Sequence, residues 1–151
     1  MASELSNCWM PIPDKGVLLL ERLQPGVMLS SIEDDERATS IVAEVMRQLW
    51  RPVHIEHSFL TVGERAEDLK KMREHFGGGC GPFPSGLVEV AEALFSEIIG
   101  SMSELVLLHG DLHHGSILLF AQRKSWLAID PKGLLGEREY EVGAMLRHPM
   151  P

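Results

Sequence analysis

The sequence predicts a single domain that combines helices with short strands, of the α/β or α+β class. The chain has 151 residues, a length typical of one domain. Its hydrophobic fraction of 44% and charged fraction of 24% are those of a protein that folds around an apolar core. Helical periodicity dominates up to about residue 100, and short apolar runs separated by turn-like segments follow it.

The N-terminal part is expected to hold one strand. Residues 1–15 lack hydrophobic periodicity and are expected to form an irregular arm that ends in a turn. The segment 16–23 is short and apolar, and it is bounded by Gly16 and by Pro25-Gly26. This pattern predicts a strand that is buried on both faces.

Two amphipathic helices with capping signals are expected next. The first follows Ser31-x-x-Asp34 and ends before Pro52, and the second follows Thr61-x-x-Glu64 and ends at the glycines 77–79. Their expected core-facing residues are Ala38, Ile41, Val42, Val45, Met46 and Leu49 in the first helix, and Val62, Ala66, Leu69, Met72 and Phe76 in the second.

The last part of the chain is expected to change from helix to short strands. A third helix opens over 82–85. Apolar runs at 105–108, 117–120 and 126–129 predict three strands, and 137–146 predicts a last helix. The residues of the third helix expected to face the core are Leu87, Ala91, Leu94, Phe95 and Ile98.

Composition excludes several classes of protein. Fourteen basic and twenty-two acidic residues give a net charge of −8, which argues against non-specific binding to nucleic acid or to an anionic membrane. No apolar run approaches the about 20 residues of a membrane-spanning helix. The first ten residues do not resemble a signal peptide, and two cysteines are too few for a disulfide framework. We therefore expect a cytoplasmic protein, and the negative charge leaves a cationic or neutral small molecule possible as its partner.

The densest group of reactive side chains lies between two predicted strands, in the segment 109–116, which reads His-Gly-Asp-Leu-His-His-Gly-Ser. A second carboxylate, Asp130, stands nineteen residues after Asp111 at the end of another predicted strand. One carboxylate could orient and deprotonate a hydroxyl group, and the other could hold a divalent cation that neutralises phosphate charge. We expect both carboxylates on one side of one cleft.

The histidines of this segment have a simpler interpretation than a zinc site. Zinc requires three or four convergent ligands, whereas His113 and His114 are adjacent and would diverge in an extended segment. His109 is instead expected to hydrogen-bond the backbone near the loop.

This layout resembles the catalytic loop and metal-binding segment of the protein-kinase-like phosphotransferases, and its His-Gly-Asp-Leu-His form is similar to that of the aminoglycoside phosphotransferases. Within that superfamily the chain resembles the streptomycin 6-phosphotransferase and hydroxyurea phosphotransferase family. The resemblance covers about residues 16–151 and rests on the segments 107–115, 128–133, 136–144, 76–84 and 18–23.

The resemblance implies an α+β fold. Residues 31–151 would form the mostly helical, protein-kinase-like large (C-terminal) lobe with the catalytic loop, and residues 16–30 would be a remnant strand and hinge of the small lobe. It also implies transfer of the γ-phosphate of ATP, with Mg²⁺, to a hydroxyl group of a streptomycin-type aminoglycoside or a hydroxyurea-like molecule. Such a reaction confers antibiotic resistance.

The resemblance also assigns roles to individual residues. Asp111 would be the base that orients the acceptor hydroxyl, and Asp130 would be the principal Mg²⁺ ligand. Ser116 occupies the second metal-ligand position, where kinases have Asn. Glu141 would brace the catalytic loop. The hinge residues, whose backbone groups would pair with adenine, are Glu21, Arg22 and Leu23.

The sequence departs from the family pattern in what surrounds these motifs. The Gly-rich loop and the strand lysine of a kinase small lobe would precede Gly16, where only fifteen residues stand, and the chain stops soon after its last helix. We therefore expect a family member that is truncated at both ends and has little or no activity. The alternatives are an inactive remnant and a non-catalytic module that binds a nucleotide or a hydroxylated ligand. Truncation would leave an open strand edge at 17–20, which favours self-association.

Overall fold

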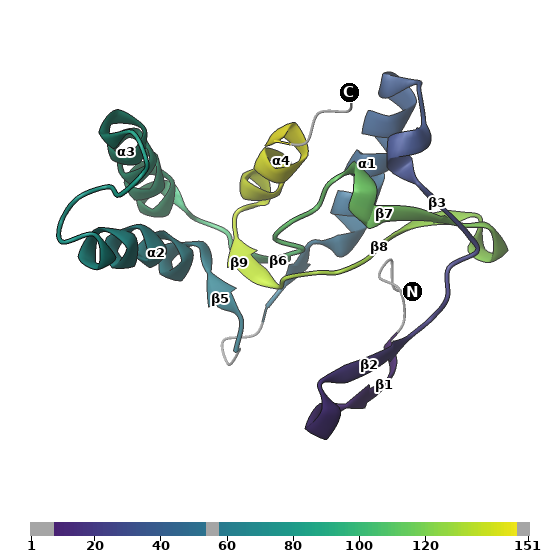
Figure 1. The fold of residues 1–151 in the computed structure, drawn as a ribbon. Coiled ribbons are helices and arrows are strands. Elements are labelled where there is room, and N and C mark those ends of the chain that lie inside the picture. The colour runs from purple at the N-terminus through teal and green to yellow at the C-terminus, as the bar shows by residue number, and fades with distance from the viewer. Residues whose placement is uncertain (1–7, 54–57, 148–151) are drawn as a thin grey trace.

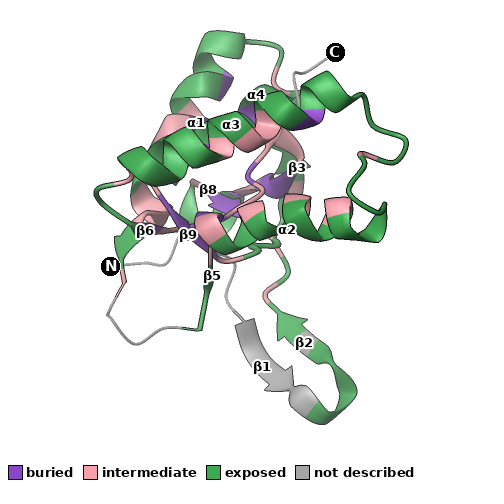
Figure 2. Cartoon of the chain, turned by 90° about the vertical axis from the view of Figure 1, so that its left-hand side faces the viewer, coloured by how far each residue is buried: buried purple, intermediate pink, exposed green. Residues whose placement is uncertain are grey.

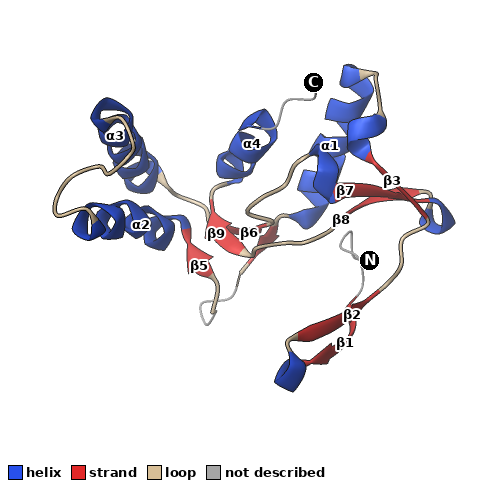
Figure 3. Cartoon of the chain, in the orientation of Figure 1, coloured by secondary structure: helices blue, strands red, loops and turns tan. Residues whose placement is uncertain are grey.

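The structure is a computed structural model that describes residues 8–53 and 58–147, and it has the expected α+β class (Figures 1 and 3). Helix α2 packs on α3, α1 packs on β8, and α4 packs on β6. In the described part of the chain, no helix combines the length and apolar character needed to cross a bilayer. The four α-helices are α1 (Asp35–Leu49), α2 (Val62–His75), α3 (Ser85–Ser101) and α4 (Arg138–Arg147).

The strands form three small sheets. One is the antiparallel pair β1–β2, and one is the antiparallel sheet β3-β7-β8. The third has the order β4-β6-β9-β5, in which β5 runs parallel to β9 and the other neighbours are antiparallel. Their bounds are β1 (Cys8–Ile12), β2 (Val17–Leu20), β3 (Pro25–Met28), β4 (Arg51–Pro52), β5 (Leu60–Thr61), β6 (Val106–Leu108), β7 (Ile117–Phe120), β8 (Ser125–Ala128) and β9 (Leu134–Gly136).

The N-terminal segment differs from the prediction. Cys8–Ile12 is a strand rather than part of an irregular arm, while residues 1–7 lie outside the described residues. Strand β2 is not buried on both faces, because Val17, Leu19 and Leu20 are each almost half exposed. The reason is that β2 pairs with β1 in a ribbon that stands apart from the other two sheets (Figures 1 and 2). Strand β3 lies within the segment 16–30, which was expected to hold one strand and a hinge. It pairs with β7 and not with β2.

We expect the chain to self-associate through this ribbon, because a two-stranded sheet with exposed leucines offers open edges to a second copy. Sedimentation velocity should show dimers or larger species that become rarer on dilution. Leu19→Lys should shift the population towards monomer, because a charge on an exposed edge strand opposes pairing. Leu94→Lys, on the exposed face of α3, is the matched control and should not. Wild-type protein that stayed monomeric at high concentration would contradict the expectation.

Two clusters of buried residues form the core. Buried residues are purple on the cartoon of Figure 2. One joins α1 to β7, β8 and α4, and the other joins the start of α2 to β6 and β9. Leu108 belongs to the second cluster and Leu112 to the first, so the loop between them is anchored at both ends. The buried members are Leu29, Ala38, Val42, Val45, Met46, Leu112, Ile117, Ala128 and Met145 in the first cluster, and Val62, Val106, Leu108 and Leu134 in the second.

The first two helices are confirmed, with one change of cap, but Phe76, which was expected to face the core, is 40% exposed at the C-cap of α2. The N-cap of α1 is Asp34, whose carboxylate accepts from the backbone N–H of Arg37 at 3.0 Å. The expected capping box at Ser31 is wrong, because Ser31 ends a 3₁₀ turn (Leu29–Ser31) and its hydroxyl donates to Met28 O. The second expected box is confirmed: the Thr61 hydroxyl accepts from Glu64 N, and the Glu64 carboxylate accepts from Thr61 N.

The face of α3 that packs inward was predicted correctly only in part: Phe95 packs against the second core cluster, but Leu87, Leu94 and Ile98 are exposed. Val88 is buried, whereas Leu87 is 68% exposed and Leu94 is 52% exposed. Apolar residues cover more than one face of this helix, so its periodicity does not select a side. The ion pair between Arg73 of α2 and Glu92, one turn after Val88, fixes the side that meets α2.

The C-terminal elements agree with the prediction. Strands β6, β7 and β8 and helix α4 fall within one residue of their expected bounds. The short strands β4, β5 and β9 were not expected. Each has only two or three residues, which is too short for a period-2 pattern to be recognised in the sequence.

Candidate active site

The loop that carries Asp111 begins where β6 ends and requires a glycine in front of the aspartate. Gly110 has a φ of +84°, a conformation that side chains disfavour. A Cβ atom there would lie 3.2 Å from the Cβ of Leu134 on β9. The His-Gly-Asp pattern therefore lets the chain turn sharply against β9 and present Asp111 beyond the core.

Glu141 of α4 fixes the backbone of this loop. Its carboxylate is 1% exposed and accepts from the N–H of His109 at 2.6 Å and from the N–H of Gly110 at 3.0 Å. Burial raises the pKa of Glu141, while the N–H groups of His109, Gly110 and Leu112 act in the opposite direction. The bracing role implied by the resemblance is thus confirmed in the contacts.

His109 ties this loop to the one that carries Asp130. Its Nε2 lies 2.9 Å from Ile129 O, and because a carbonyl oxygen only accepts, Nε2 carries the proton. His109 O accepts from the N–H of Lys132 at 2.8 Å and from the N–H of Gly133 at 3.2 Å. Burial lowers the pKa of His109. The expected structural role of this histidine is confirmed.

Asp130 follows β8 in a left-handed conformation, with a φ of +61°. Its side chain is exposed, and its Oδ2 lies 2.5 Å from Lys132 Nζ. The hydrogen bond and charge of Lys132 hold the pKa of Asp130 below its usual range. Backbone strain and an exposed carboxylate at a strand end are features of functional sites.

Asp111 is held from the other side by the last turn of α4. Its Oδ1 accepts from Arg147 Nη2 at 2.7 Å. Asp111 follows His109 by two residues, and His109 hydrogen-bonds the backbone on both sides of Asp130, at Ile129 O and at the N–H groups of Lys132 and Gly133. The structure therefore brings the two aspartates to adjacent loops.

Ser116 lies beside the Asp130 loop but already uses its hydroxyl. The side chain is buried, donates to His113 O at 2.9 Å and accepts from His113 N at 3.0 Å. Its backbone O accepts from Ile129 N, next to Asp130. Ser116 thus closes a one-turn 3₁₀ segment (His114–Ser116) that precedes β7.

The donor set fits magnesium only in part. Asp130 supplies a hard carboxylate oxygen, but this oxygen is already paired with the ammonium of Lys132. Within residues 8–53 and 58–147, no group of three or more His, Cys, Asp or Glu side chains converges on a metal position. Mg²⁺ commonly binds through one or two carboxylates together with substrate phosphates and water, so Asp130 is compatible with such a site.

The expected hinge residues lie at the opposite end of the β7–β8 hairpin from Asp130. They connect β2 to β3, and the carboxylate of Glu21 pairs with Arg123 in the turn between β7 and β8, at 3.1 Å. The backbone of Gln24 accepts from Ala121 N in the same turn. Leu23 is partly buried and Arg22 is exposed.

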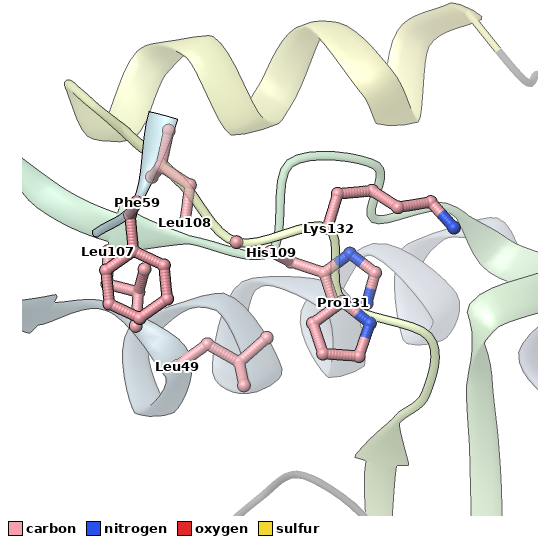
Figure 4. Close-up of a pocket in the computed structure, with 8 residues that line it drawn as sticks. Leu49, Phe59, Leu107, Leu108, His109, Pro131 and Lys132 are labelled. Atoms are coloured by element: carbon pink, nitrogen blue, oxygen red, sulfur yellow. The ribbon is translucent and has the colours of Figure 1, made fainter. Parts of the chain in front are cut away.

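A pocket of about 330 Å³ opens beside His109 (Figure 4). Its walls are mostly apolar and include Leu49, Phe59 and Pro131. Neither candidate aspartate lines it, and the ammonium of Lys132 points away from it (Figure 4).

Sequence reasoning missed the two cations of the site, Lys132 and Arg147. Lys132 lies two residues after Asp130 in the same motif, and this closeness in sequence could have indicated an ion pair. Arg147 is 36 residues from Asp111, and no local pattern relates them.

Comparison with known proteins gives concordant matches. The family model described as aminoglycoside/hydroxyurea antibiotic resistance kinase matches residues 12–151. A hydroxyurea phosphotransferase of Kitasatospora aureofaciens is 33% identical over 139 residues, which cover 84% of this chain and 37% of the relative. A streptomycin 6-kinase of Streptomyces glaucescens is 30% identical over 131 residues, which cover 86% of this chain and 42% of the relative. The chain thus spans about two fifths of the length of these relatives.

Proposed function

Because the chain belongs to the aminoglycoside/hydroxyurea antibiotic resistance kinase family, we propose that it takes part in transferring the γ-phosphate of ATP to a hydroxyl group of a streptomycin-type or hydroxyurea-like small molecule. Residues 31–151, together with β3, would be the large lobe of a kinase-like enzyme. The observation that carries the proposal is that His109 joins, through hydrogen bonds, the two loops that carry Asp111 and Asp130.

Asp111 is assigned the role of base. Glu141 holds the backbone in front of it, and Arg147 holds its Oδ1. Within the described residues no hydrogen bond engages Oδ2, which is therefore free to accept the proton of an acceptor hydroxyl. Orienting and deprotonating that hydroxyl is what a kinase catalytic aspartate contributes.

Asp130 is assigned the role of Mg²⁺ ligand, and the backbone of the segment 21–23 is assigned to adenine binding. Four residues of β7 separate the two ends of the hairpin, which is about 13 Å at 3.3 Å per residue. An extended nucleoside triphosphate can bridge such a span, with its base near Glu21 and its terminal phosphates near Asp130. Bound Mg²⁺ would neutralise charge on those phosphates.

Ser116 is assigned an indirect contact with the metal. Its hydroxyl already donates one hydrogen bond and accepts another within its own turn. Because a serine is also shorter than the asparagine of kinases, we propose that it reaches Mg²⁺ through a water molecule.

The proposal is tested by incubating the chain with Mg-ATP and either streptomycin or hydroxyurea, and analysing both acceptors by mass spectrometry. We expect ATP-dependent formation of a monophosphorylated product from one of them, at the low rate that the sequence leads us to expect. Binding of Mg-ATP without transfer to either acceptor would contradict the proposal and favour a non-catalytic binding module. Absence of both binding and transfer would favour an inactive remnant.

A further inference from the structure

Each aspartate of the candidate site is paired with a cation from the chain itself. The Lys132–Asp130 pair differs from the other in that both partners lie in one four-residue segment, 130–133. The backbone of this segment is fixed, since the N–H groups of Lys132 and Gly133 both donate to His109 O. Its side chains are open to solvent: that of Lys132 is 46% exposed and that of Asp130 is 76% exposed.

A fixed main chain with a solvent-exposed ammonium allows the charge to move while its attachment stays in place. Lysine carries a compact charge on a flexible four-carbon stem, and exposed ion pairs of this kind are weak. The ammonium of Lys132 also extends away from the apolar pocket beside His109, so no contact in that pocket has to be broken when it moves (Figure 4).

We propose that Lys132 is an exchangeable counter-ion of Asp130. Without a metal, its ammonium occupies the carboxylate. When a Mg-nucleotide binds, the divalent cation displaces the ammonium from Asp130, and the ammonium then binds oxygens of the terminal phosphate. This inference rests on the proposed function, because it takes Asp130 as the metal ligand.

The physical reason for the exchange is competition between charges. An ammonium and Mg²⁺ repel each other and cannot both occupy the same carboxylate oxygen, whereas the phosphates that arrive with the metal supply new acceptors within reach of the lysine stem. Lys132 should therefore oppose the binding of a bare metal ion and favour the binding of the metal–nucleotide complex.

The test compares two affinities in the full chain and in Lys132→Met, which keeps the length of the side chain and removes its charge. The probes are Mn²⁺ alone, followed by electron paramagnetic resonance, and Mg-ATP, followed by calorimetry. Lys71→Met is the matched control, because Lys71 forms an exposed pair with Asp68 on α2. Asp130→Asn tests whether Mn²⁺ binds at the carboxylate of Asp130, because metal binding at that position should weaken in this variant.

We expect Lys132→Met to bind Mn²⁺ about two- to five-fold more tightly, as loss of a competing exposed ion pair predicts. The same variant should bind Mg-ATP about ten-fold more weakly, as loss of a charged hydrogen bond predicts. Lys71→Met should change neither affinity. If wild type binds both probes, two results would overturn the inference. One is that Lys132→Met changes the affinities for Mn²⁺ and Mg-ATP in the same direction. The other is that Lys132→Met still tightens Mn²⁺ binding when Asp130→Asn is also present. The proposed function fails differently, with a wild-type chain that binds neither probe, and that result would overturn the inference as well.

Discussion

Glu141→Ala should lower the free energy of unfolding by about 2–6 kcal/mol, which is enough to unfold many domains of this size. The carboxylate of Glu141 accepts the N–H groups of His109 and Gly110 inside the protein. Alanine would leave the buried N–H of His109 and the partly buried N–H of Gly110 without partners, at up to about 1–3 kcal/mol each. Urea unfolding followed by circular dichroism measures the change. Glu139→Ala, at an exposed position of the same helix, is the matched control and should cost less than about 0.5 kcal/mol.

Glu141→Gln should lie between wild type and Glu141→Ala in stability, and it should remove a dependence on pH. Burial raises the pKa of Glu141 above its ordinary value of 4.5, so the folded state binds this proton more tightly than the unfolded state. The protonated carboxyl therefore stabilises the fold most below pH 4.5, and this contribution is lost as the pH rises through the raised pKa.

The difference in stability between wild type and Glu141→Gln should therefore shrink as the pH rises across that window. The pKa of His109 is lowered by burial, so its contribution is present above its ordinary value of 6.5 and lost as the pH falls through the lowered pKa. That effect is common to both proteins and largely cancels in the difference. A difference that grew with rising pH would show that the carboxylate, rather than the neutral acid, is the form that the fold prefers.

The elements that could be predicted are those whose cause is local. The capping box of Thr61 and Glu64 depends on residues three apart, and it forms as expected. Ser31 shows the limit of such a local signal. Both Ser31 and Asp34 are suitable N-cap residues, and in the structure Asp34 caps α1. The exposed ribbon and the orientation of α3 depend on which neighbours cover a surface, and an apolar run looks the same whether it is covered or not.

In the candidate site, too, the residues that could be predicted are those in local motifs. His109, Asp111 and Asp130 belong to two short motifs, and their positions at strand ends follow from the apolar runs before them. Glu141 was assigned through the resemblance and could not be placed by spacing, because α4 meets the loop only when β6 and β9 pair. Arg147 reaches Asp111 for the same reason, six residues further along α4.

The mutation expected to change activity most is Asp111→Asn, which should lower the rate constant of phosphate transfer by about 10²–10⁴-fold, the usual contribution of a positioned general base. Asparagine keeps the shape of the side chain, and its oxygen can still accept from Arg147, so the loop should stay folded. It cannot take up the proton of an acceptor hydroxyl.

The affinity for Mg-ATP separates the two aspartates. Asp111→Asn should leave that affinity within about two-fold of wild type, because its role is assigned to the acceptor hydroxyl rather than to the metal, and changes outside a binding contact usually amount to less than about 0.5 kcal/mol. Asp130→Asn should weaken Mg-ATP binding and transfer together, since an amide oxygen is a poorer ligand for Mg²⁺ than a carboxylate. Asp68→Asn, on the surface of α2, controls for the loss of one negative charge. Transfer by Asp111→Asn at the wild-type rate would show that the hydroxyl proton leaves by another route, and the assignment of the base would have to be abandoned even if the chain proved to be a kinase.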